Sequence, residues 1–230
     1  MKNSNSNTSN PRRDFIGKLA AGAAAMGMAS IVAPVNAVAG TEIPLYTAGD
    51  PEAWLARIKG KHRIAFDVTH PNGTMPFAWP KVFLMTNGAA AKDCSVVVIL
   101  RHDAIPFTMN SDLWAKYKFG ELFKINDPLT KAPAVRNPFW EPKTGDYTVP
   151  GIGNVDIGIN QLMQDGVLFC ACDVAITVFS AITAAGMNGN AAEIKKEWEA
   201  GLLPGVQLVP SGVWAVGRVQ EHGCSYCFAG

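Results

Sequence analysis

The sequence SVVVIL at residues 95–100 is an uninterrupted apolar run. A strand with one face in water alternates apolar and polar side chains, whereas a continuous run is typical of a strand that is covered on both faces. The sequence VLFCAC at residues 167–172 has the same character. Two strands of this kind predict a parallel sheet that lies between two layers of helices.

Strand and helix patterns alternate along the chain outward from these two runs. HRIAFDVT at 62–69 alternates apolar and polar residues, and short apolar runs at 206–209 and 224–228 predict two more strands. Helical patterns occur at about 80–87, from Ser111, from Asn154 to Gly166, from Asp173 to about Gly186, at 191–200, and from Ser211 to Gly223. The sequence therefore predicts an α/β fold with a five-stranded parallel, flavodoxin-like sheet and helices on both faces.

The expected strand order, with strands numbered along the chain, is the flavodoxin-like order 2-1-3-4-5. A crevice then opens between the carboxyl ends of strands 1 and 3, and ligands of open α/β sheets bind in such a crevice.

Residues 126–153 interrupt the alternation. The segment contains five prolines and the aromatic residues Phe139, Trp140 and Tyr147, and it shows no periodicity. Structureless loops of this length are uncommon inside compact domains and are often functional. Two interpretations stay open: a surface strap that buries Phe139 and Trp140, or a lid or subunit contact at the carboxyl edge of the sheet.

The first 39 residues have the pattern of a twin-arginine export signal. Arg12 and Arg13 begin the stretch RRDFIGK, and an apolar, glycine-rich run follows at 19–35. Ala37-Val38-Ala39 then supplies a cleavage site of the small-x-small type, with Ala37 and Ala39 as its small residues. We therefore expect an exported, periplasmic protein whose mature chain, residues 40–230, forms one domain.

The composition limits the partners of that domain. The formal net charge is +1 and no basic stripe is present, so nucleic acid is not an expected partner. No second apolar segment approaches membrane length, so no membrane association is expected after the signal is removed. Five cysteines are too few for a disulfide scaffold of this size, and their odd number leaves at least one thiol unpaired within the chain.

Several pieces of the sequence resemble the DsrE/DsrF-like family of sulfur-relay proteins. The resemblance covers roughly residues 64–228, apart from the long segment, and it depends on the order and spacing of the pieces. They are DVT at 67–69, a helix that ends at Asn87, VVVILRHDA at 96–104, GVLFCAC at 166–172, LPGV at 203–206, VPSGV at 209–213 and QEHGCSY at 220–226.

This resemblance implies a flavodoxin-like fold, frequent homo-oligomers and a persulfide-carrying cysteine, which corresponds to Cys172. A thiol-bearing or sulfur-carrying partner is implied as well. Three features depart from the family pattern: the export signal, the inserted segment, and Arg101-His102-Asp103 where relatives usually have a histidine followed by glycine. The cytoplasmic sulfur-relay roles of the family therefore cannot simply be carried over to an exported protein.

The cysteines differ in their expected chemistry. Cys172 lies where strand 3 meets the helix that Asp173 is expected to cap, and the free N–H groups of a helix start favour a thiolate. Burial as a small apolar residue is the alternative, and it is the better expectation for Cys170. Cys224 and Cys227 have the C-x-x-C spacing, but in a strand they point to opposite faces about 10 Å apart.

The histidines supply the remaining site candidates. His70 follows strand 1 beside the expected crevice, and His102 follows strand 2, one strand further away. Either could act as a base or hydrogen-bond partner for Cys172, or be an ordinary polar loop residue. No phosphate-binding or dinucleotide-binding motif is present, so no cofactor is expected.

These observations predict a protein that binds or relays sulfur through a persulfide on Cys172. His70 or His102 assists it, and Asp173, Phe139 and Trp140 lie beside it. The alternative is a non-catalytic module for small-ligand binding or oligomeric assembly, with structural cysteines. A third possibility is a metal or electron-transfer carrier that uses Cys170, Cys172 and a histidine.

Overall fold

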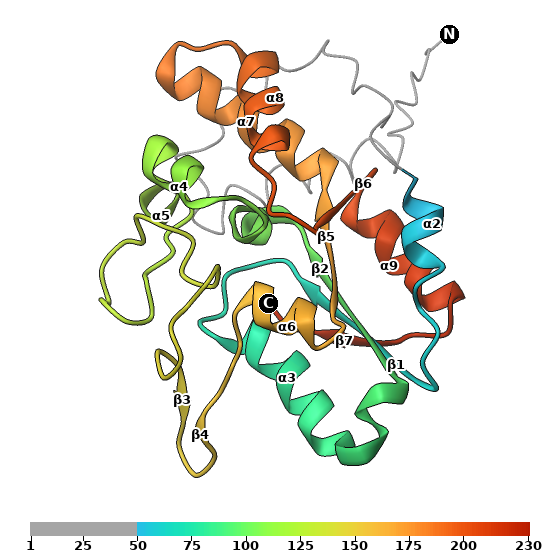
Figure 1. Cartoon of the computed structure of the whole chain (residues 1–230). Helices are drawn as coiled ribbons and strands as arrows, with labels where there is room; N and C mark the ends of the chain where they lie inside the picture. The colour runs from blue at the N-terminus through green and yellow to red at the C-terminus, as the bar shows by residue number, and fades with distance from the viewer. Residues whose placement is uncertain (1–49) are drawn as a thin grey trace, which may run out of the picture. The chain divides into compact units, whose positions relative to one another are not determined.

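The computed structural model describes residues 50–230. The export signal predicted at residues 1–39 lies outside the described residues. Five strands form one sheet (Figure 1): β1 (His62–Val68), β2 (Cys94–Leu100), β5 (Leu168–Cys172), β6 (Gln207–Val209) and β7 (Ser225–Phe228). Every pair of neighbouring strands in this sheet is parallel, so the α/β class and the five-stranded parallel sheet are confirmed.

The helices surround this sheet. They are α2 (Pro51–Leu55), α3 (Met75–Asn87), η2 (Gly88–Asp93), η3 (His102–Thr108), α4 (Ser111–Tyr117), α5 (Phe119–Leu122), α6 (Ile159–Gln164), α7 (Asp173–Met187), α8 (Ala191–Ala200) and α9 (Gly212–Glu221). Among these helices, none combines the length and the apolarity that crossing a bilayer would require.

The strand order differs from the expected 2-1-3-4-5. The sheet has the order β6-β5-β2-β1-β7, which in chain order is 4-3-2-1-5. β2 therefore lies at the centre instead of at an edge, and it pairs with both β1 and β5. The apolar run at 95–100 explains this position, because a strand without polar side chains is best accommodated between two others with helices above and below.

Two hydrophobic cores cover the two faces of the sheet. Val96, Val98 and Leu100 of β2 belong to the larger core, which α3 and α7 complete. Val97 and Ile99, which point the other way, belong to the smaller core under α2 and α9. The helices thus lie on both faces, as the sequence predicts.

The helices that follow β5 and β6 lie on opposite faces of the sheet, and this change marks its topological switch point. α7, which follows β5, packs on the face of the larger core, and α9, which follows the neighbouring strand β6, packs on the other. Ligands of open α/β sheets bind where adjacent strands send the chain to opposite faces. The expected crevice between strands 1 and 3 is therefore wrong, and the switch point lies at the carboxyl ends of β5 and β6.

Two helices begin elsewhere than expected. α3 ends at Asn87 as predicted but begins at Met75, because Pro76 occupies the first turn, where proline is tolerated. The helix expected from Asn154 begins at Ile159 instead. Asn154 belongs to a two-stranded hairpin of β3 (Thr148–Val149) and β4 (Gly153–Asn154), which uses the backbone groups that a helix would need.

The segment 126–153 packs against the larger core as a strap. Phe139 is 1% exposed, and Trp140 is half-buried against the same core. Asn137 is fully buried and donates hydrogen bonds from its side-chain amide to the carbonyls of Phe107 and Met109, each at 2.9 Å. The strap is therefore part of the folded core over its central residues.

Candidate functional site

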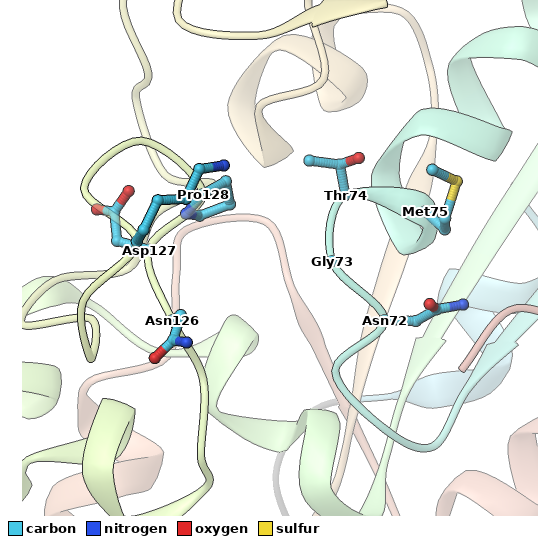
Figure 2. A pocket seen from close by; sticks show the side chains of 8 residues that line it. Asn72, Gly73, Thr74, Met75, Asn126, Asp127 and Pro128 are labelled. Carbon is cyan, nitrogen blue, oxygen red and sulfur yellow. The ribbon is translucent and has the colours of Figure 1, made fainter.

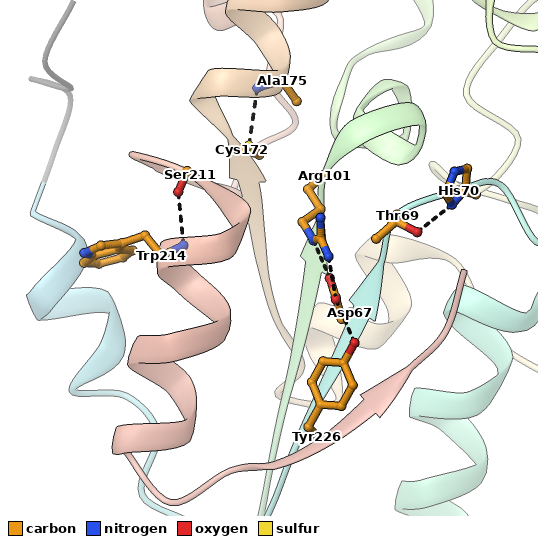
Figure 3. A network of polar contacts seen from close by, with 9 residues as sticks. All are labelled: Asp67, Thr69, His70, Arg101, Cys172, Ala175, Ser211, Trp214 and Tyr226. Atoms are coloured by element: carbon orange, nitrogen blue, oxygen red, sulfur yellow. Dashed lines mark hydrogen bonds and ion pairs between the residues drawn. The ribbon is translucent and has the colours of Figure 1, made fainter. Parts of the chain in front are cut away.

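Cys172 lies at the switch point, as the last residue of β5 and the N-cap of α7. The backbone N–H of Ala175 donates a hydrogen bond to its Sγ at 3.3 Å (Figure 3). The N–H groups of a helix start carry partial positive charge, and one of them is directed at the Cys172 sulfur. Cys172 is 6% exposed, so only a slender reactant reaches its sulfur without movement of the chain.

The start of α9 lies across the switch point from Cys172. Val209, the last residue of β6, is in register with Cys172, and Ser211 caps α9 by accepting a hydrogen bond from the N–H of Trp214 at 3.0 Å. Figure 3 shows the two capped helix starts. Two helix N-termini on neighbouring strands give this edge of the sheet a positive potential.

Arg101, which follows β2, forms an ion pair at this edge. Its Nε and Nη2 donate hydrogen bonds to the two carboxylate oxygens of Asp67, at 2.7 and 2.9 Å (Figure 3). The hydrogen bond to Asp67 is the largest cause that raises the pKa of Arg101, and the electrostatic attraction of Cys172 also raises it. Arg101 is thus held at this edge by its pairing with the buried Asp67.

Gly212 allows Arg101 to approach α9 closely. A Cβ atom at this position would lie 2.4 Å from Cδ and 2.6 Å from Cβ of Arg101. No side chain fits there without displacing the arginine, so the glycine is needed for the packing of Arg101 against the start of α9.

Asp67 is the centre of a polar network inside the sheet. The residue is 2% exposed, and the hydroxyl of Tyr226 donates a third hydrogen bond to it at 2.9 Å. Burial, followed by the hydrogen bond to Asp67, raises the pKa of Tyr226. The network borders a hollow of about 370 Å³ beside α9, lined by Asp67, Arg101, Val213, Val216, Gln220 and Tyr226.

The other cysteines are placed for packing. Cys170 is fully buried in the smaller core, as expected, and burial raises its pKa well above the usual value. Cys224 lies in the smaller core and Cys227 packs against the larger one, so the C-x-x-C residues point to opposite faces, as predicted. Within the described residues, no disulfide joins any two cysteines.

The histidines are not arranged as expected. Since β2 is the neighbour of β5, His102, which follows β2, is nearer in strand order to Cys172, and His70, which follows β1, is one strand further away. His102 Nδ1 pairs with Asp103 at 3.1 Å, and this hydrogen bond is the largest cause that raises the pKa of His102. Within residues 50–230, no hydrogen bond joins either histidine to Cys172. No contact within these residues therefore supports His70 or His102 as a direct base for Cys172.

The expected ligand-binding residues have other partners. Asp173 is buried in the first turn of α7, one residue after the actual N-cap, and pairs with Lys195 of α8 at 2.9 Å. Burial raises the pKa of Asp173, and the hydrogen bond from Lys195 opposes this. Phe139 belongs to the core, where its ring contacts that of Phe77 at a tilt and stacks against that of Tyr147. These side chains support the fold around the site.

A second hollow lies where the strap approaches the loop after β1 (Figure 2). It measures about 470 Å³ and is lined by Asn72, Gly73, Thr74, Met75, Asn126, Asp127, Pro128 and Lys131. The beginning of the strap therefore lies beside the loop that leaves the carboxyl end of β1, as the direction of the chain requires.

The sequence interpretation missed Asp67, Arg101 and Tyr226 as site residues. Asp67 interrupts the apolar pattern near the end of a predicted strand, and Arg101 follows an entirely apolar strand. The sequence signal was an acidic residue, Asp67, inside a strand and a basic residue, Arg101, directly after the next strand. Only the pairing of β1 with both β2 and β7 brings these two residues together with Tyr226.

Comparison with known proteins gives little further information. No family model and no curated protein matches the chain. Among solved structures, a protein of unknown function from Methanobacterium thermoautotrophicum, MTH1491, is similar at 15% sequence identity. The alignment covers 73% of this chain and 99% of that one, with a TM-score of 0.39.

Proposed function

We propose that this protein is an exported sulfur carrier of the DsrE/DsrF-like type, which holds sulfur as a persulfide on Cys172. The observation that carries the proposal is the position of the Cys172 sulfur. It accepts a hydrogen bond from a backbone N–H at the start of α7, at the switch point of the sheet. Reactive cysteines lie in electropositive surroundings, and the start of α7 supplies such surroundings for the Cys172 sulfur.

The proposed reaction is an exchange at sulfur. The Cys172 thiolate attacks the terminal sulfur of a hydropersulfide or polysulfide donor, and the donor's S–S bond breaks as the new S–S bond forms. The rest of the donor leaves as a thiolate with the electron pair, and the terminal sulfur keeps its proton. The number of S–S bonds is unchanged, so no external oxidant or reductant is needed. The limited exposure of Cys172 favours slender inorganic donors.

Two parts of the proposal concern the protein's surroundings. The twin-arginine pattern supports export to the periplasm, and exposed apolar side chains along one side of α3 (Met75, Trp79, Val82 and Met85) support a homo-oligomer. A thiol-bearing partner would receive the sulfur. Cell fractionation and light scattering test the first two parts, and a cytoplasmic monomer would contradict both.

Intact mass spectrometry after brief exposure to polysulfide tests the sulfur chemistry. We expect the mature protein to gain sulfur that a reductant removes, and the Cys172→Ser variant to gain none. Cys227→Ser is the matched control, because Cys227 is the more exposed thiol and should not be needed. Equal gain by the wild type and the folded Cys172→Ser variant would refute the role of Cys172. No gain by the wild type would favour the non-catalytic binding module.

A further inference from the structure

Three potential metal ligands meet at the carboxyl ends of β1 and β2. His70, His102 and Asp103 each offer one ligand atom, and these atoms all lie within 4.8 Å of one another. His70 Nε2 lies 3.9 Å from one carboxylate oxygen of Asp103, and His102 Nδ1 lies 3.1 Å from the other. Two imidazoles and one carboxylate are a ligand set that proteins use for zinc and for non-haem iron.

The surroundings of His70 resemble those of a metal-binding histidine. Its Nδ1 is hydrogen-bonded to the hydroxyl of Thr69 at 2.5 Å, and Thr69 is buried. This contact orients the ring and leaves Nε2 on the side of Asp103. In metal sites the second ring nitrogen of a histidine ligand is almost always held in this way, which fixes the orientation of the ring.

The backbone and neighbours of His102 also hold its ring in the cluster. His102 has a left-handed backbone, with φ at 52°, which non-glycine residues seldom adopt and which is enriched at ligand-binding sites. Its ring packs edge-on against Phe179 of α7 and lies 5.3 Å from the ring of His70. The neighbouring cation, Arg101, is directed to Asp67 and leaves Asp103 to the histidines.

We propose that His70, His102 and Asp103 bind one divalent first-row transition-metal ion, such as Zn²⁺, with further positions open to solvent. Ligand atoms of a tetrahedral zinc site lie roughly 3.4 Å apart, so the widest separation in the cluster, at most 4.8 Å, has to shrink by up to about 1.4 Å. The side chains of both histidines are about half exposed, so small adjustments of their torsion angles can bring the ligand atoms together while these contacts are kept. The site uses no cysteine, so it does not depend on the proposed sulfur chemistry.

Calorimetric titration of the chelator-treated mature protein with Zn²⁺ tests this site. We expect one ion per chain, and at least about tenfold weaker binding for His70→Gln and for Asp103→Asn. His62→Gln is the matched control, because His62 is exposed at the opposite, amino end of β1 and should bind zinc as the wild type does. Circular dichroism of the metal-free variants establishes that they are folded.

Three outcomes would overturn the proposal. They are the absence of saturable binding, binding that folded His70→Gln and Asp103→Asn variants retain in full, and binding that Cys172→Ser abolishes. The last would place the ion on the thiol instead. Retained binding by Cys172→Ser supports the histidine site whether or not the protein carries sulfur.

Discussion

Replacing Phe139 by alanine is expected to lower the free energy of unfolding by about 3–5 kcal/mol, as large-to-small changes of buried aromatics do. The side chain is 1% exposed, and its ring centroid lies 4.2 Å from that of Phe77 and 5.3 Å from that of Tyr147. Its removal leaves a cavity between the strap and α3. Urea denaturation of the wild type and the variant measures the difference.

Val135→Ala is the matched control for the strap. Val135 belongs to the same segment but is 74% exposed, so its truncation should change the free energy of unfolding by less than about 0.5 kcal/mol. A loss for Phe139→Ala as small as that of the control would contradict the assignment of the strap to the core. It would favour a segment that opens as a lid.

Replacing Asp67 by alanine is expected to lower the free energy of unfolding by about 2–4 kcal/mol. Removing one partner of a buried ion pair typically costs roughly 3–5 kcal/mol, because the other charge stays buried without compensation. The expected loss in free energy of unfolding is somewhat smaller here because the Arg101 side chain is 26% exposed, and water screens part of its charge. Tyr226 loses its hydrogen-bond acceptor in the same variant.

Asp165→Ala provides the comparison for this second prediction. Asp165 accepts a hydrogen bond from Lys81 at 2.7 Å, but at the exposed surface, where an ion pair contributes about 0–1 kcal/mol. Thermal or urea unfolding should therefore show a clearly larger loss of stability for Asp67→Ala than for Asp165→Ala. If Asp67→Ala cost no more than Asp165→Ala, the network would not stabilise the sheet, and the positioning of Arg101 would need another cause.

Local sequence patterns contain enough information to predict the elements of this fold but not their order. The apolar run at 95–100 predicts a strand covered on both faces, because its side chains leave no polar face. Neither this run nor the periodicity of the helices determines which strand becomes its neighbour. The order 4-3-2-1-5 depends on packing between distant segments, and so does the position of the switch point.

The same limit applies to the candidate site. The position of Cys172 at a helix start follows from a strand that passes directly into a helix, which the sequence shows. The network of Asp67, Arg101 and Tyr226 joins three strands, and it is predictable only after β1 is known to lie between β2 and β7. The cluster of His70 with His102 and Asp103 needs only the pairing of β1 with β2, which the expected order 2-1-3-4-5 already contains.

The transfer of sulfur out of the loaded protein shows whether Cys172 carries it. Cyanide attacks the outer sulfur of a persulfide and forms thiocyanate, and the cysteine is released as a thiolate. After polysulfide treatment and removal of the excess donor, we expect about one thiocyanate per chain from the wild type and none from Cys172→Ser. Equal release from both proteins, or no release from the wild type, would contradict a sulfur carrier based on Cys172.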